Sequence, residues 1–337
     1  MFTQPDDLTD DAVGDTLLRG WGLVADGVAY AALGFGSHHW NAVVGDTKWF
    51  VTVDDLDARL QHAGETRLRA RQRLTAALST AQAIQRRGRS FVVAPVPSLA
   101  GSVLDDVDER YVLALYPHID GRAGSWGRYE TQAERFAVID RLVDIHGATQ
   151  IVKSIAGADD FSIPSRDRLT VALAETSSSW STGPYAERTR ALLVRHADDL
   201  NSVLSRYDDL VARVRQSADE PVVTHGEPHP GNVIFTPDGA SLIDWDTTLL
   251  APHERDLWSL VDEDPEVAPY YTSKSERSLN DDALRLYRTG FSSRSSRRRS
   301  WRCFVDRFRR SANFLNLPRA GSGIETMPAS RSSRASL

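Results

Sequence analysis

The sequence predicts an α+β fold of two lobes, with a small N-terminal lobe rich in β-structure and a larger, mostly helical C-terminal lobe. Two observations lead to this prediction. Segments 28–44 and 48–54 alternate apolar and polar residues with the two-residue period of a half-buried strand, whereas residues beyond 129 mostly repeat apolar side chains with helical spacing. We therefore expect an N-terminal lobe over residues 1–116, a C-terminal lobe over 117–288 and a Ser/Arg-rich tail over 289–337.

The N-terminal lobe is expected to begin with a helix at 7–20, followed by the two β-like segments. Between these segments lies a turn that contains Gly34, Gly36 and Ser37. Glycine allows backbone N–H groups to approach a ligand closely, so such a turn can close over phosphates, although the pattern alone is weak. A long helix at 60–87 and strands at 91–97 and 110–116 complete the lobe. Pro117 ends the last strand, and residues 118–122 form a connector.

The C-terminal lobe shows helical patterns at 129–149, 166–180, 185–217 and 254–262. Between the third and the fourth lies a short hairpin whose loops are unusually rich in polar side chains, namely His225, Glu227, His229, Asn232, Asp244 and Asp246. The Asp238–Gly239 pair favours a two-residue turn, which would return the chain and bring Asp244 beside Asn232.

The chemistry of this hairpin indicates a magnesium and phosphate site. Mg²⁺ prefers one or two carboxylates or other hard oxygen ligands together with water and substrate phosphates, and Asn232 and Asp244 supply such oxygens. Glu227 is then the free carboxylate that can accept a proton from an attacking hydroxyl group. Zinc bound by His225 and His229 is an alternative, but Pro228 between them prevents a helical His pair. His225 could equally be a hydrogen-bonded scaffold residue.

The hairpin motifs resemble those of a known family. His225-Gly226-Glu227-x-His229-x-x-Asn232, followed by Ile243-Asp244-Trp245-Asp246, resembles the H-G-D-x-H-x-x-N and I-D-W/F motifs of the aminoglycoside phosphotransferase and choline kinase family. Residues 251–257 (APHERDL) are similar to the spectinomycin phosphotransferase branch. The resemblance implies a two-lobed protein-kinase-like fold, ATP and Mg²⁺ as cofactors, and phosphoryl transfer to a small-molecule hydroxyl acceptor.

The resemblance also implies roles for individual residues. Glu227, together with His225, is placed at the catalytic position, and Asn232 and Asp244 at the metal positions. Asp256 matches a buried aspartate that braces the catalytic loop. The expected nucleotide-binding residues are Gly34, Gly36 and Ser37 in the turn, Lys48 at the phosphates, and Leu115 and Tyr116, whose backbone would pair with adenine.

Two residues depart from the family pattern at its centre. Thr52 stands where the family has its phosphate-binding lysine, and Glu227 stands in place of aspartate. The chain has only three lysines, so Lys48 is the candidate replacement. Lys48 and Thr52 face the same side of a strand, but their Cα atoms would be roughly 13 Å apart. A nucleotide-binding pseudokinase therefore stays open as an alternative to an active enzyme.

Charge is distributed unevenly along the chain. Residues 271–337 hold 15 Lys and Arg against 5 Asp and Glu, whereas the other 270 residues hold 25 against 41. The acidic body favours a cationic small molecule over nucleic acid, apart from a contact that the basic tail could make. We expect an aminoglycoside or aminocyclitol antibiotic as the acceptor, with an amino alcohol or sugar metabolite as the alternative. The Ser/Arg-rich tail could be disordered or the product of an altered reading frame.

Composition sets the remaining expectations. A chain of 337 residues is long enough for two lobes around a cleft. The single cysteine, Cys303, excludes an intramolecular disulfide. The N-terminus lacks the apolar segment of a signal peptide, and no apolar run reaches the roughly 18 residues that span a bilayer. We therefore expect a cytoplasmic protein without a membrane partner.

Overall fold

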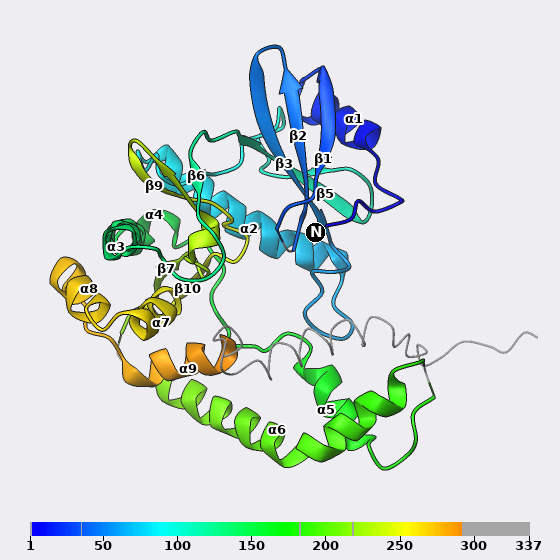
Figure 1. Ribbon diagram of the computed structural model, residues 1–337, viewed down its shortest axis with the longest axis vertical. Helices are drawn as coiled ribbons and strands as arrows, with labels where there is room; N and C mark the ends of the chain where they lie inside the picture. Colours follow the sequence, from blue (N-terminus) through cyan, green and yellow to red (C-terminus); the bar gives the residue numbers. More distant parts are fainter. Residues whose placement is uncertain (1, 35, 182, 218, 292–337) are drawn as a thin grey trace, which may run out of the picture.

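The two expected lobes are seen in the computed structural model, which describes residues 2–34, 36–181, 183–217 and 219–291 (Figure 1). An antiparallel sheet forms the upper part in Figure 1, and most of the helices lie below and to its left. The arrangement confirms the α+β fold and the order of its parts.

The N-terminal sheet has five strands in the order β1-β2-β3-β5-β4. Their bounds are Gly27–Ala31 (β1), His38–Val44 (β2), Thr47–Asp55 (β3), Asp105–Asp106 (β4) and Tyr111–Pro117 (β5). Helix α1 (Asp10–Trp21) begins at Thr9, whose side chain accepts a hydrogen bond from the Ala12 N–H. Residues of α1, such as Leu17, pack with Trp40 and Leu113 on one face of this sheet.

The opposite face of the sheet joins the core of the C-terminal lobe. Helix α2 (Arg67–Arg86) begins after Thr66, whose side chain caps it, so the predicted helix at 60–87 starts later than expected. Its apolar residue Leu78 belongs to the same buried cluster as Ala114 of β5 and Leu257 of the C-terminal lobe. One continuous core therefore links the two lobes.

The loop between β3 and α2, residues 56–66, reaches toward the C-terminal lobe. The Ser165 N–H donates to the Gln61 carbonyl at 2.7 Å, and the Ala63 N–H donates to Asp167 Oδ2 at 2.7 Å. Ser165 and Asp167 lie at the beginning of helix α5 (Arg166–Ala174). The loop thus connects the sheet with the helical end of the molecule.

The predicted strand at 91–97 is wrong, because this segment contains only an isolated bridge, between Val92 and Leu242. Pro95 and Pro97 lack the N–H groups that a continuous ladder requires. The segment instead joins two sheets. The Val93 N–H donates to the Leu242 carbonyl at 3.0 Å, and the Val96 N–H donates to the Leu115 carbonyl at 2.7 Å.

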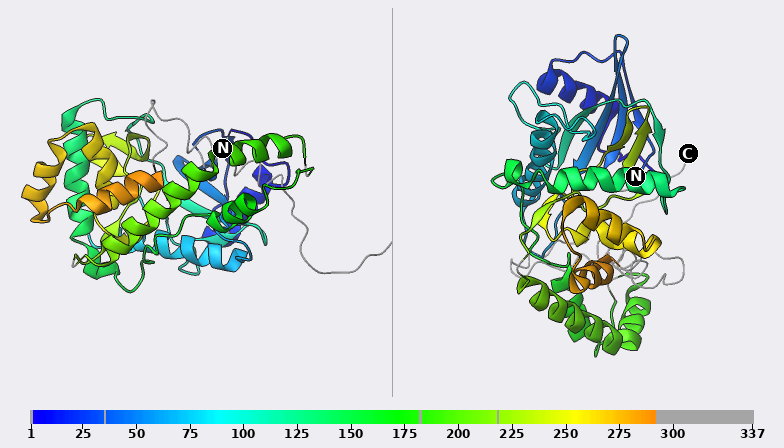
Figure 2. Two further views of the ribbon diagram at one scale, coloured as in Figure 1. Left: turned by 90° about the horizontal axis from the view of Figure 1, so that it is seen from below. Right: turned by 90° about the vertical axis from the view of Figure 1, so that its left-hand side faces the viewer.

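The C-terminal lobe places short strands among helices. Strands β6 (Arg122–Ala123), β8 (Val233–Thr236) and β9 (Gly239–Leu242) form one sheet, and β7 (Val222–Thr224) pairs with β10 (Leu249–Ala251). The other helices are α3 (Gln132–His146), α4 (Thr149–Val152), α6 (Ala186–Arg215), α7 (Glu254–Glu263), α8 (Val267–Ser275) and α9 (Asp281–Phe291), with a 3₁₀ turn at Pro230–Asn232. Both views of Figure 2 show α6 and α9 side by side.

Helices α8 and α9 lie beyond the helical patterns found in the sequence. Leu286 of α9 packs with Tyr207 and Leu210 of α6, which extends the core toward the end of the described chain. The predicted tail boundary at 289 falls inside α9. Predictions about residues 292–337 lie outside the described residues. Among the described helices, none is both long and apolar enough to cross a membrane.

Candidate active site

The site is built on the loop that follows β7, and Asp256 at the start of α7 holds this loop in place. Asp256 Oδ2 accepts from the His225 N–H at 2.9 Å, and Oδ1 accepts from the Gly226 N–H at 2.5 Å. His146 Nε2 lies 3.1 Å from the same Oδ2. Burial alone would raise the pKa of Asp256, but the hydrogen bond from His146 and the neighbouring positive charges hold it below its usual value. The structure thus shows the brace that the family resemblance implied.

Gly226 occupies a position in this loop that only glycine fits. Its φ of 97° lies in the left-handed region. A Cβ atom at this position would lie 2.4 Å from Nη1 of Arg255. The Arg255 guanidinium is itself fixed behind the loop, because it donates to Thr224 Oγ1 at 2.8 Å and to the Thr247 carbonyl at 2.7 Å.

His225 is held between two backbone groups of the site. Its side chain is fully buried, and burial lowers its pKa, so the ring is neutral. Nε2 lies 2.9 Å from the Ile243 carbonyl and donates to it, while Nδ1 accepts from the Glu227 N–H at 3.3 Å. Both ring nitrogens are therefore engaged with backbone, as in a scaffold residue, and the expected catalytic role of His225 stays a prediction.

Glu227 projects from the braced loop, and its side chain is 23% exposed. His229 Nε2 lies 3.9 Å from Glu227 Oε2. The Trp126 ring, which is 55% exposed, meets the His229 ring edge-on at 4.1 Å between centroids. The carboxylate of Glu227 thus has access to solvent beside an aromatic surface.

The hairpin brings Asn232 and Asp244 together, as the sequence predicts. Val233 pairs with Leu242, and the Ile243 N–H donates to the Asn232 carbonyl at 3.0 Å. The two loop residues are 237 and 238 rather than the expected 238 and 239, because Thr236 pairs with Gly239. Pro237 has a fixed φ and no N–H, which suits the first loop position. The one-residue shift leaves the juxtaposition of Asn232 and Asp244 intact.

The oxygens of this pair fit a divalent cation. Asn232 Nδ2 donates to the Glu227 carbonyl at 3.0 Å, which turns its amide oxygen away from that contact. Asp244 has a φ of 65°, in the left-handed region. Desolvation by the surrounding protein, together with the charges of Asp246 and Glu227, raises its pKa well above the usual value. A cation would relieve this repulsion.

In the described part of the chain, no group of three or more His, Cys, Asp or Glu side chains is arranged to hold a metal ion. Mg²⁺ does not need such a group, because it keeps several waters and uses one or two carboxylates. The donor set of Asn232 and Asp244 is therefore of the kind that suits Mg²⁺ rather than zinc.

The glycine-containing turn of the N-terminal lobe has the expected backbone. Gly34 and Gly36 have φ values of 59° and 98°, which favour glycine at both positions. Ser37 Oγ donates to Asp54 Oδ1 of β3 at 2.7 Å, so the end of the turn is fixed to the sheet. Whether these residues bind a nucleotide stays a prediction.

Lys48 does not lie where the resemblance would need it. It is exposed at the beginning of β3, opposite Val43 and beside the β2–β3 turn. Asp54, whose side chain reaches the site, is six residues further along the strand, which corresponds to roughly 20 Å. Lys48 is thus a surface residue at the strand end, and its contact with the phosphates stays a prediction.

The backbone of Leu115 and Tyr116 is partly engaged within the protein, and its pairing with adenine stays a prediction. The Leu115 carbonyl already accepts from the Val96 N–H at 2.7 Å. Tyr116 lies opposite Phe50 within the β3–β5 ladder. The side chain of Tyr116 nevertheless lies near the site, because burial and the charges of Asp54, Asp244 and Asp246 raise the pKa of its hydroxyl.

Arg59, Asp54 and Asp246 form an ion-pair network that the sequence reasoning missed. Arg59 Nε and Nη2 donate to Asp54 Oδ1 at 2.8 and 2.5 Å, and Nη2 also donates to Asp246 Oδ2 at 2.7 Å. Nη2 is 3.3 Å from Ser37 Oγ. Burial alone would lower the pKa of Arg59, but the two carboxylates outweigh it and the pKa is raised. The signal in the sequence was Asp54, a charged residue that interrupts the apolar end of a strand.

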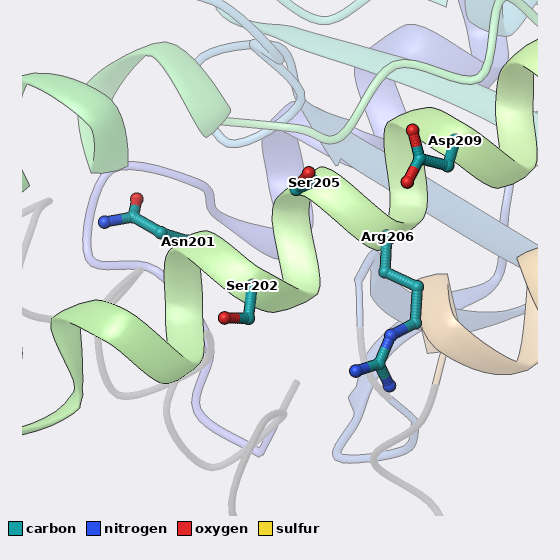
Figure 3. A pocket seen from close by; sticks show the side chains of 5 residues that line it. All are labelled: Asn201, Ser202, Ser205, Arg206 and Asp209. Atoms are coloured by element: carbon teal, nitrogen blue, oxygen red, sulfur yellow. The ribbon is translucent and has the colours of Figure 1, made fainter.

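A shallow surface depression lies away from these residues, on α6 (Figure 3). Its lining comes from that helix alone and consists of Asn201, Ser202, Ser205, Arg206 and Asp209. It contains none of the loop carboxylates and is separate from the candidate active site.

The two-lobed fold that carries this site is a protein-kinase-like fold, which it shares with solved kinase and phosphotransferase structures. Residues 42–294 match the phosphotransferase enzyme family (APH), and the chain belongs to this family. This range begins near the end of β2 and includes β3, β4, β5 and the hairpin.

Similar proteins support this assignment. The chain is 28% identical over 186 residues to protein StrN of Streptomyces griseus, a match that covers 52% of this chain and 55% of that protein. The chain thus matches about half the length of this curated relative.

Solved structures share the fold at low sequence identity. Spectinomycin phosphotransferase in complex with ADP and spectinomycin has a TM-score of 0.63 at 14% identity, covering 89% of this chain and 94% of that one. Amicoumacin kinase in complex with AMP-PNP and Ca²⁺ has a TM-score of 0.55 at 13% identity, covering 90% and 93%. Choline kinase LicA of Streptococcus pneumoniae has a TM-score of 0.53 at 14% identity, covering 91% and 98%.

Proposed function

We propose that this protein transfers the γ-phosphoryl group of ATP to a hydroxyl group of an aminoglycoside or aminocyclitol. The observation that carries the proposal is the placement of Glu227 on a rigidly braced loop, beside the oxygens of Asn232 and Asp244. The nucleotides bound in the similar structures, ADP and AMP-PNP, support ATP as the donor.

Glu227 is the proton acceptor in this proposal. Phosphoryl transfer requires little covalent chemistry from the protein, so orienting the acceptor hydroxyl and receiving its proton are the main tasks of the loop. The hydrogen bond from the Glu227 N–H to His225 and the brace at Asp256 fix the backbone on which the carboxylate is mounted. Glutamate extends one methylene further than the family's aspartate and is equally able to accept a proton.

Asn232 and Asp244 would hold Mg²⁺. When bound, this ion neutralises negative charge on the transferred phosphates and helps to orient them. The hydrogen bond from the Ile243 N–H to the Asn232 carbonyl sets the spacing between Asn232 and Asp244. The raised pKa of Asp244 supports the assignment, because the carboxylates crowd one another without a cation.

A cationic acceptor is supported by charge. The 270 residues before residue 271 carry 41 acidic against 25 basic side chains, which attracts positively charged molecules over a distance of about one Debye length. Amino groups are common to aminoglycosides and aminocyclitols. The similarity to spectinomycin phosphotransferase, at a TM-score of 0.63, supports this acceptor class.

An amino alcohol is the second candidate for the acceptor. It is favoured by the likeness to choline kinase, at a TM-score of 0.53, and to a microcompartment-associated aminopropanol kinase, at 0.52. A panel assay separates the candidates. Acceptor-dependent ADP formation should appear with an aminocyclitol or aminoglycoside. Activity with amino alcohols alone would show that the acceptor is an amino alcohol.

The catalytic assignment is tested with Glu227→Gln. We expect turnover to fall by roughly two to four orders of magnitude, the usual contribution of general base catalysis, while nucleotide affinity changes by less than about twofold. Asp238→Asn, in the exposed turn of the same hairpin, is the matched control and should keep wild-type turnover. Equal turnover in wild type and Glu227→Gln would refute the role of Glu227.

A further inference from the structure

At the position of β3 where this family carries its phosphate-binding lysine, this protein has no lysine, and Lys48 lies at the far end of the same strand. Position 52 is threonine, which lies opposite Ala114 in the β3–β5 ladder. The ATP phosphates are strongly negative, and the carboxylates of Asp54, Asp244 and Asp246 lie nearby. A positively charged side chain is therefore needed to make the site attractive to a nucleotide.

Arg59 is placed where such a charge is required. Its guanidinium contacts Ser37 at the end of the glycine-containing turn and Asp246 two residues after Asp244. It thus lies between the turn expected to cover the phosphates and the carboxylates expected near the metal. Its side chain is 20% exposed, so one side of it is accessible from the site.

The two carboxylates that hold Arg59 differ in burial. The Asp54 side chain is only 3% exposed and also accepts a hydrogen bond from Ser37, so it anchors the guanidinium to the sheet. The Asp246 side chain is 21% exposed and can exchange its contact for another anion. Within the described residues, Arg59 makes its hydrogen bonds through Nε and Nη2, which leaves Nη1 for a further acceptor.

Two other arginines, Arg255 and Arg73, bind to other protein groups. Arg255 lies behind the catalytic loop and is bonded to Thr224 and Thr247. Arg73 forms an ion pair with Glu65 and donates to the Arg59 carbonyl at 2.8 Å. Both are held against protein atoms, and neither is shown contacting Ser37 or Asp246.

We propose that Arg59 binds the phosphates of the nucleotide and takes the place of the lysine that is missing at position 52 of β3. Asp54 keeps the guanidinium oriented, and the nucleotide phosphate replaces Asp246 as its outer partner. The planar guanidinium suits this exchange, because it binds carboxylate and phosphate with the same paired N–H geometry. The inference rests on the proposed function, since it requires a nucleotide in this site.

The test compares Mg·ADP with adenosine, which carries no phosphate, by calorimetry on the full chain. In Arg59→Ala we expect Mg·ADP affinity to fall about 10- to 100-fold, as for loss of a charged hydrogen bond, while adenosine affinity stays within about twofold. Arg59→Gln removes the charge but keeps much of the side chain, and it carries the same expectation if the alanine variant does not fold. Arg67→Ala is the matched control, because Arg67 makes a two-point contact with Asp57 at the surface of the same region.

The outcomes separate this inference from the function on which it rests. Loss of Mg·ADP affinity alone supports it. A wild type that binds Mg·ADP together with Arg59 variants that bind it equally well would overturn the role of Arg59 and leave the proposed function standing. An equal loss for adenosine and Mg·ADP would show that Arg59 only maintains the structure. A wild type that binds no nucleotide would refute the proposed function and the inference together.

Discussion

Replacing Asp256 by asparagine should destabilise the protein strongly, although the two side chains have nearly the same shape. Three donors converge on this buried carboxylate: the His225 and Gly226 N–H groups and His146 Nε2. Asparagine has a single acceptor oxygen. If that oxygen takes the place of Oδ2, it can still accept from His225 and His146. The amide nitrogen then takes the place of Oδ1, which accepts from the Gly226 N–H at 2.5 Å in the wild type, so two donors face each other.

The expected size of the effect follows from these contacts. A hydrogen bond to a charged group contributes about 1.5–3 kcal/mol, and leaving a buried N–H unsatisfied costs about 1–3 kcal/mol. Removal of one partner from a buried charged pair costs about 3–5 kcal/mol in other proteins. We therefore expect Asp256→Asn to lower the free energy of unfolding by about 3–5 kcal/mol.

Urea unfolding measures this loss, and its pH dependence tests the cause. The pKa of Asp256 is below its usual 3.8 in the folded protein, so its contribution is present above pH 3.8 and is lost as the pH falls through the folded pKa. The difference between wild type and variant should shrink accordingly at low pH. Asp262→Asn is the control, because this residue of the same helix has a side chain 40% exposed in an ion pair with Arg288. Its effect should stay below about 1 kcal/mol. A similarly small effect for Asp256→Asn, or a difference that does not change with pH, would contradict the reasoning.

Three further changes test the surroundings of the site. Gly226→Ala should lower stability by about 1–3 kcal/mol in thermal unfolding, because its φ is 97° and the new Cβ would lie 2.4 Å from the Arg255 guanidinium; an unchanged melting temperature would argue against this loop geometry. Burial raises the pKa of Glu254 from 4.5 to about 7, so wild type should lose stability relative to Glu254→Gln as the pH rises through this range, by at most about 3 kcal/mol in urea titrations. Parallel pH profiles would disprove that cause. Lys48→Ala should leave nucleotide affinity within about twofold by calorimetry, since Lys48 is exposed at the far end of β3; a tenfold loss would restore it as a phosphate ligand.

The local features of the hairpin could be predicted because short-range rules determine them. The β-branched runs and the turn at 237–239 fix which residues lie opposite one another, and this alone brings Asp244 beside Asn232. The turn shifted by one residue because Pro237 competes with the Asp-Gly preference. Such a shift cannot be decided from the sequence when two turn signals overlap.

Features that depend on distant parts of the chain could not be predicted. Residues 91–97 are apolar enough for a strand, but their hydrogen bonds go to Leu115 and Leu242, which are far away in sequence. The contact between Arg59 and Asp246 joins residues 187 positions apart. With 37 arginines in the chain, no local signal distinguishes Arg59 from the others. Its role follows only from the way the lobes meet.

The loop between β3 and α2 has a thermodynamic consequence. Within residues 56–66, Arg59 contacts Asp246, and the Gln61 carbonyl and the Ala63 N–H hold the beginning of α5. A ligand that replaces Asp246 as the partner of Arg59 therefore binds to the same segment that contacts α5. For an acceptor held by α5, its affinity and that of the nucleotide must be coupled, and each ligand must change the binding of the other by the same factor. Order of binding would then alter rates but not the final occupancy, because the free energy of the ternary complex is the same by either route.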